Sequence, residues 1–139
     1  MTLANRGKAA ETAVKKYLAG VEAANATSIR FPDARSGSFQ VTPCDFITLR
    51  KGQLYMLEVK AVEHPVRLPF KNFSVDQMAR MRAWESAGAE AWVLVYFTPL
   101  KLWRAETVGY FMNREVGGSW NMEHIEAKPL TEIMQEIFK

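Results

Sequence analysis

The stretch DFITLRKGQLYMLEVK, from Asp45 to Lys60, decides the fold of this chain. Asp45–Leu49 and Leu54–Val59 are two runs of strand-forming residues, separated by a short polar segment that contains a glycine. This pattern predicts two antiparallel strands joined by a tight turn. Because alternate residues of a strand share a face, Glu58 and Lys60 point the same way, and the turn brings Asp45 back towards them.

Other elements are predicted on both sides of this hairpin from hydrophobic periodicity and from turn and cap residues. The expected elements are a helix over 6–24, an extended piece around 29–31, a loop over 64–73, a helix over 74–87, a buried strand over 91–97, a strand over 100–104 and helices over 105–115 and 131–138. This order predicts an α/β fold with a mixed β-sheet flanked by helices. A chain of 139 residues fits a single domain, 1–139.

Composition excludes several classes of protein. Apolar residues make up 48% of the chain and charged residues 24%, which is typical of a folded globular domain and not of a disordered one. No apolar run is long enough to cross a bilayer, so no membrane partner is expected. The polar start of the chain lacks the apolar centre of a signal peptide, and the single cysteine, Cys44, cannot form an internal disulfide. These features predict a cytoplasmic protein.

Charge is unevenly distributed along the chain. Residues 1–82 carry 13 basic and 7 acidic residues, a net +6, whereas residues 83–139 carry 5 and 8, a net −3. A basic first part indicates a surface that binds a polyanion such as DNA. Solvated helix faces would explain the same excess equally well.

The hairpin carries the residues that indicate a reaction. Burying a carboxylate is costly unless the group is paired or binds a metal, and here Asp45 and Glu58 converge beside the ammonium of Lys60. Carboxylate oxygens suit Mg²⁺, and a lysine beside them can stabilise negative charge on a phosphate, so this set predicts phosphodiester hydrolysis. The alternative is an exposed hairpin with an ordinary Glu–Lys pair.

The pattern Asp45…Glu58-Val59-Lys60 resembles the PD-(D/E)xK nuclease signature. Together with Asn5-Arg6-Gly7, with Glu11 and with the stretch LPFKNF followed by Gln77, it resembles the RecU family of Holliday junction resolvases over nearly the whole chain. The first half is also similar to the archaeal Hjc resolvases. The resemblance implies a restriction-endonuclease-like core.

The resemblance also implies an activity, a cofactor and a set of residues. The activity is that of a Mg²⁺-dependent endodeoxyribonuclease, with Mn²⁺ also possible, that resolves four-way DNA junctions by paired symmetric nicks as a homodimer. The implied catalytic residues are Asp45, Glu58, Lys60 and Glu11, the implied metal contacts are Asp45, Glu58 and Gln77, and the implied DNA contacts are Arg6, Lys71 and Asn72.

Two departures from the family pattern are visible. The family usually has a threonine two residues before the motif aspartate, where it contributes to the metal site, and this chain has Pro43. The family also carries a projecting stalk, for which Asp33–Phe39 is a short and flexible counterpart. Both departures leave open a nuclease for flaps or duplex DNA, or a DNA-binding recombination accessory protein without activity.

Gln77 has two explanations. Its spacing from Ser74 is that of a capping box at the start of the 74–87 helix, which needs no metal. The family resemblance instead implies that its amide oxygen faces the Asp45–Glu58 pair.

Overall fold

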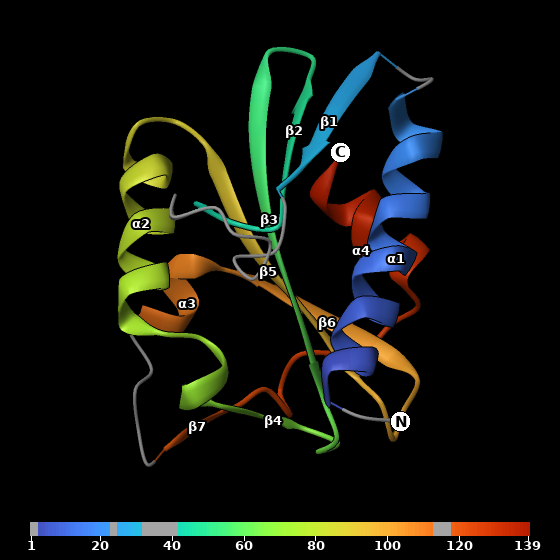
Figure 1. Cartoon of the computed structure of the whole chain (residues 1–139), viewed down its shortest axis with the longest axis vertical. Helices are drawn as coiled ribbons and strands as arrows, with labels where there is room; N and C mark the ends of the chain where they lie inside the picture. The colour runs from blue at the N-terminus through green and yellow to red at the C-terminus, as the bar shows by residue number, and fades with distance from the viewer. Residues whose placement is uncertain (1–2, 23–24, 32–41, 113–117) are drawn as a thin grey trace.

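A mixed five-stranded sheet forms the centre of the molecule, with helices on both faces (Figure 1). The computed structural model describes residues 3–22, 25–31, 42–112 and 118–139. The strand order is β1-β2-β3-β5-β6. The strands are β1 Ala26–Arg30, β2 Phe46–Arg50, β3 Gln53–Val62, β5 Glu90–Phe97 and β6 Leu102–Thr107. The predicted α/β class with a mixed sheet is confirmed.

The predicted hairpin is present as β2 and β3, which pair antiparallel with Phe46 opposite Leu57. The turn between them places Lys51 at φ 50° and Gly52 at φ 78°, the left-handed pair that a tight two-residue hairpin turn requires. β3 then pairs in parallel with β5, and β5 pairs antiparallel with β6. β3 therefore lies in the middle of the sheet.

Helices cover both faces of the sheet (Figure 1). On one face lie α1 (Leu3–Glu22) and α4 (Leu130–Ile137), and on the other lie α2 (Val75–Ser86) and α3 (Val108–Met112). Alternation along β3 divides its side chains between two cores, with Leu57 packed on the α1 side and Met56 on the α2 side. Glu58 and Lys60 have the same parity as Met56, so they face the side covered by α2.

A small second sheet corrects two predictions. The segment 64–73, predicted as a loop, contains β4 (Arg67–Pro69) and the 3-10 helix η2 (Phe70–Asn72). β4 pairs antiparallel with β7 (Ser119–Asn121), which was predicted as neither strand nor helix. This pairing joins segments about fifty residues apart, and so it leaves no local pattern in either of them.

The predicted helix over 105–115 is also wrong in its first part. Residues up to Thr107 continue β6, and the helix α3 is limited to Val108–Met112 within the described residues. The pairing of β6 with β5 extends to Thr107 opposite Trp92, and this ladder outweighs the helical preference of the segment. The first helix begins three residues earlier than predicted, and the other predicted helices and strands are confirmed within a few residues.

The predicted counterpart of the stalk, Asp33–Phe39, lies outside the described residues. Among the helices that the structure does describe, none is both long enough and apolar enough to pass through a membrane.

Candidate active site

Asp45 stands where three strands meet. It immediately precedes β2, and its backbone carbonyl accepts a hydrogen bond at 2.8 Å from the N–H of Phe31, just after β1. Its side-chain Oδ2 accepts another at 2.8 Å from the backbone N–H of Val59 on β3. The hairpin register and these two hydrogen bonds hold the carboxylate of Asp45 against the backbone of Val59, the residue that follows Glu58 on β3.

Glu58 is a buried carboxylate, and only one of its two oxygens has a partner among the described residues. Its Oε2 lies 2.9 Å from Nζ of Lys60, and the residue is only 3% exposed. Its other oxygen, Oε1, is buried and has no hydrogen-bond partner among the described residues. A buried carboxylate oxygen without a donor is costly, so this atom is suited to bind a cation.

Lys60 connects the strand to the helix α2. Besides the ion pair with Glu58, its ammonium donates a hydrogen bond at 3.2 Å to Oε1 of Gln77. It also lies 5.5 Å from the ring centre of Phe73, within the range of a cation–π contact. One ammonium therefore links a carboxylate, an amide oxygen and an aromatic ring.

The two explanations of Gln77 concern different parts of the residue. Ser74 is the N-cap of α2, and its hydroxyl accepts the backbone N–H of Gln77 at 3.1 Å. The side-chain oxygen of Gln77 instead accepts from Lys60. The serine half of the capping box is therefore formed, while the glutamine side chain reaches the site.

The electrostatics of the site favour a bound cation. Burial, followed by the negative charge of Glu58, raises the pKa of Asp45 to about 8, and Glu11 adds to the rise. The N–H of Val59 and the charge of Lys60 act in the opposite direction on this pKa and do not outweigh the burial. Two adjacent carboxylates without enough nearby positive charge to neutralise both are a typical environment for a divalent metal ion.

Glu11 stands beside this pair and not within it. Its Oε2 accepts a hydrogen bond at 2.7 Å from the guanidinium of Arg30, the last residue of β1. In the described parts of the chain, no three His, Cys, Asp or Glu side chains come together to form a metal site. The oxygen donors brought together are thus two carboxylates, of Asp45 and Glu58, with the amide of Gln77 next to them across Lys60.

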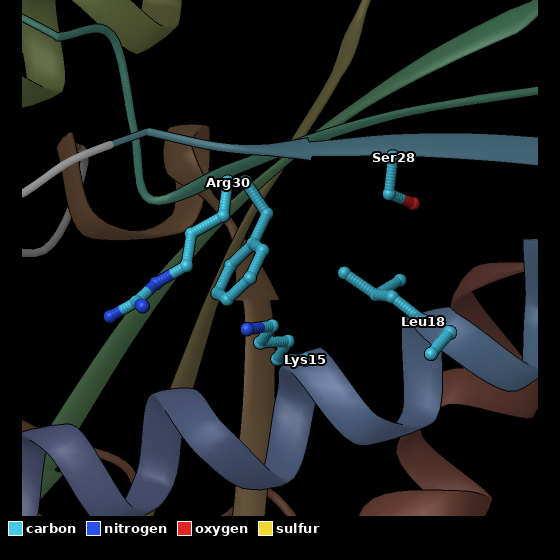
Figure 2. A pocket seen from close by; sticks show the side chains of 6 residues that line it. Lys15, Leu18, Ser28 and Arg30 are labelled. Atoms are coloured by element: carbon cyan, nitrogen blue, oxygen red, sulfur yellow. The ribbon is translucent and has the colours of Figure 1, made fainter.

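Arg30 is a site residue that sequence reasoning missed. It lines a pocket of about 190 Å³ between α1 and β1, together with Lys15. Figure 2 shows Lys15 and Leu18 projecting from α1 towards Ser28 and Arg30 on the strand. The only signal in the sequence was a basic residue within the predicted extended piece around 29–31, which does not reveal a partner on a helix.

The residues proposed to contact DNA belong to other elements than the two carboxylates do. Arg6, in the first turns of α1, is buried and forms an ion pair with Glu63, just beyond the end of β3. Lys71 is exposed and Asn72 half-buried on η2, next in the chain to Phe73, whose ring faces Lys60. The structure therefore brings together Asp45, Glu58, Lys60 and Gln77, with Glu11 adjacent and the basic residues on the periphery.

This donor set fits a divalent cation. Oxygen ligands from two carboxylates and an amide suit Mg²⁺ or Mn²⁺, and Oε1 of Glu58, which has no hydrogen-bond partner in the part of the chain that the structure describes, could be one of them. Cys44, beside Asp45 in the chain, is buried in the core on the α2 side, where burial raises the pKa of its thiol to about 12. Its thiol donates a hydrogen bond at 3.0 Å to the backbone carbonyl of Phe46.

Comparison with known protein families finds a match. The family model described as "RecU: Recombination protein U" matches residues 12–136, a span that includes Asp45, Glu58, Lys60 and Gln77 and begins just after Glu11. No curated protein matches the chain.

A solved structure shares the fold. It is that of Archaeoglobus fulgidus Hjc, described as a Holliday junction resolvase from an archaeal hyperthermophile. The two superpose with a TM-score of 0.58 and 20% sequence identity, over 86% of this chain and 94% of that one. The core of the present chain is accordingly restriction-endonuclease-like.

Proposed function

The chain belongs to the RecU family of recombination proteins, and on that premise we propose that it is a structure-specific endodeoxyribonuclease that resolves four-way (Holliday) junctions. The observation that carries the proposal is the pairing of Asp45, just before β2, with the buried Glu58 of β3, beside Lys60. Likeness to the fold of a protein described as a Holliday junction resolvase supports the choice of substrate.

The divalent cation, Mg²⁺ or Mn²⁺, would be held by Asp45, Glu58 and Gln77. When bound, it supplies an activated water and offsets negative charge on the phosphate. Pro43 offers no hydroxyl in place of the family's threonine, so the carboxylates carry more of the binding in this chain.

The chain's own residues have three tasks. Lys60 stabilises the negative charge that develops on the scissile phosphate, because its ammonium is held beside the carboxylates by Glu58 and Gln77. Glu11 adds negative potential near Asp45 and so strengthens cation binding. Arg6, Lys71 and Asn72 contact the DNA backbone, consistent with the basic excess of residues 1–82.

Resolution of a junction needs two symmetric nicks, one in each of two strands. We infer a homodimer with paired active sites, because a two-fold protein matches the two-fold symmetry of the junction. In this proposal the whole chain, 1–139, is one nuclease domain that works in the cytoplasm.

A cleavage assay tests the function. The protein is incubated with Mg²⁺ and with a four-way junction, a flap or a linear duplex of matched sequence, and the products are separated on a denaturing gel. Symmetric nicks in the junction alone are the expected result. Preferential cutting of the flap or the duplex would identify a nuclease of the same fold with another substrate, and junction binding without cleavage under any divalent metal would identify an accessory protein.

A further inference from the structure

A second basic pocket lies at the start of α1. This end of α1 lies near the turn between β5 and β6 (Figure 1). The pocket encloses about 360 Å³. Its lining residues come from α1, from the end of β3 and from the β5–β6 turn, and they are Arg6, Ala9, Glu63, Tyr96, Thr98 and Lys101. The pocket therefore has two cations and one anion around an apolar wall.

Arg6 lines this pocket, and only part of its guanidinium group is paired within the described residues. Its side chain is only 10% exposed and forms an ion pair with Glu63 through Nη1, while its Nε is buried without a partner among the described residues. Arg6 also stands near the N-terminal end of a helix, where the helix dipole makes a cation unfavourable. Both features favour the arrival of an additional anion.

Glu63 is a weak partner for this arginine. Its side chain is 69% exposed, so the ion pair is open to water on the glutamate side. Exposed ion pairs contribute little because solvent and salt screen them. A phosphate offers more charge and more acceptor oxygens to a guanidinium than one exposed carboxylate does.

Lys101 supplies the second cation. It is exposed in the β5–β6 turn, lines the same pocket as Arg6, and has no ion-pair partner among the described residues. The pocket is separated from the carboxylates, because Glu63 follows Val62, which lies four strand positions beyond Glu58 on β3, roughly 13 Å along the strand. A phosphate bound here belongs to a different nucleotide from the one that is cut.

We propose that this pocket receives a backbone phosphate of the bound DNA between Arg6 and Lys101, and that Glu63 is the intramolecular competitor that this phosphate displaces from Arg6. The proposal rests on the proposed function only for the identity of the ligand as DNA. It gives Glu63 a role of its own, which is to lower the affinity for DNA. None of the roles proposed for the active-site residues includes this effect.

The first test removes the competitor. Binding of a fluorescent four-way junction and of a linear duplex is measured by anisotropy in EDTA, which prevents cleavage. Glu63→Gln is expected to raise the affinity roughly two- to fivefold, the range that corresponds to the loss of one exposed ion pair. Glu136→Gln is the matched control, because Glu136 also forms an exposed ion pair, with Lys128, and the change in net charge is identical.

The second test removes the second cation. Lys101→Asn is expected to flatten the plot of log affinity against log salt by about one unit, the effect of one lost phosphate contact. Lys51→Asn is its control, because Lys51 is also an exposed turn lysine with a left-handed backbone, at φ 50° against 53° for Lys101. Asparagine tolerates this conformation, so both variants should keep the wild-type melting temperature.

Equal affinities of the two glutamine variants, or equal salt slopes of the two asparagine variants, would overturn the proposal. A wild-type protein that binds no DNA would overturn both this proposal and the proposed function. The proposed function fails alone if the variants differ as expected and the wild type nevertheless leaves junctions uncut with Mg²⁺.

Discussion

The side-chain oxygen of Gln77 accepts a hydrogen bond from the ammonium of Lys60 at 3.2 Å, while the backbone N–H of the same glutamine is capped by Ser74. The residue therefore belongs both to the start of α2 and to the site. Its helical role depends on the backbone, and its role in the site depends on the side chain. A side-chain substitution separates the two.

We predict that Gln77→Ala lowers cleavage clearly while the melting temperature changes little. The cap survives because Ser74 still accepts the backbone N–H of residue 77, whereas Lys60 loses a partner and the metal a contact. Gln77→Glu should be tolerated, since a carboxylate can bind both Lys60 and a cation. Ser74→Ala is the converse control and should cost about 1 kcal/mol of stability with cleavage intact at a permissive temperature. A drop in stability with normal cleavage in Gln77→Ala would assign this side chain to the helix alone.

A second prediction concerns the carboxylates. Asp45→Asn and Glu58→Gln should each reduce cleavage roughly a hundredfold or more, because each removes a charged ligand of the cation. Junction binding in EDTA should be retained or slightly increased, since neither change removes a phosphate contact and both reduce negative charge. Near wild-type cleavage by either variant, measured in single turnover with Mg²⁺, would contradict the site assignment.

Lys60→Ala gives a third test. It should reduce the rate at saturating Mg²⁺ by orders of magnitude and leave the Mg²⁺ concentration for half-maximal cleavage within about threefold of the wild type, because the ammonium acts on the phosphate and not on the cation. Lys60→Arg would show whether charge alone suffices. Wild-type rates for Lys60→Ala would reduce its role to neutralising Glu58 in the folded protein.

The fourth prediction is a pH dependence of the metal-free protein. The pKa of Asp45 is about 8 in the folded state, against 3.8 for the ordinary side chain, so the folded state holds a proton that the unfolded state releases. Stability from this group is complete below about pH 4 and is lost as the pH rises to about 8, at up to ~1.4 kcal/mol per pH unit. Thermal melts in EDTA between pH 5 and 8 should show this loss, and Asp45→Asn should lack it. Stabilisation by added Mg²⁺ should grow over the same range, because cation and proton compete for one carboxylate. Identical plots of melting temperature against pH for the wild type and Asp45→Asn would contradict a raised pKa of Asp45 in the folded state.

A fifth prediction separates support from ligation at Glu11. Its carboxylate is bonded to Arg30 and acts on Asp45 through its charge. Glu11→Gln should therefore raise the Mg²⁺ concentration for half-maximal cleavage roughly threefold and leave the rate at saturating Mg²⁺ nearly unchanged. A large loss of rate at saturating Mg²⁺ would make Glu11 a direct participant in the reaction.

Much of the fold could be predicted because it depends on local patterns. The β2–β3 hairpin follows from two apolar runs and a Lys-Gly turn, and α2 follows from Ser74 as its cap. The convergence of Asp45 on the Glu58 strand is a direct consequence of the hairpin. These features are determined by residues close together in the sequence.

The features that could not be predicted depend on contacts between distant segments. The pairing of β4 with β7 and the bonds of Arg30 to Glu11 and of Arg6 to Glu63 each join elements whose relative placement is set by the whole fold. No periodicity or motif in either partner reports such a contact. The extension of β6 to Thr107 likewise depends on pairing with a neighbouring strand, since Thr107 lies opposite Trp92 of β5.

The small β4–β7 sheet makes the placement of Lys71 and Asn72 depend on the last part of the chain. The 3-10 helix η2, which carries Lys71 and Asn72, is held in place by contacts with residues 118–120. The backbone N–H of Phe70 donates to the carbonyl of Gly118 at 3.0 Å, and the ring of Phe70 lies 4.4 Å from that of Trp120. A chain cut before this segment would keep the residues proposed to bind metal and would lose the anchor of the proposed DNA-contact turn. The placement of the two residues proposed to contact DNA therefore depends on a buried side chain, Trp120, from a distant part of the chain.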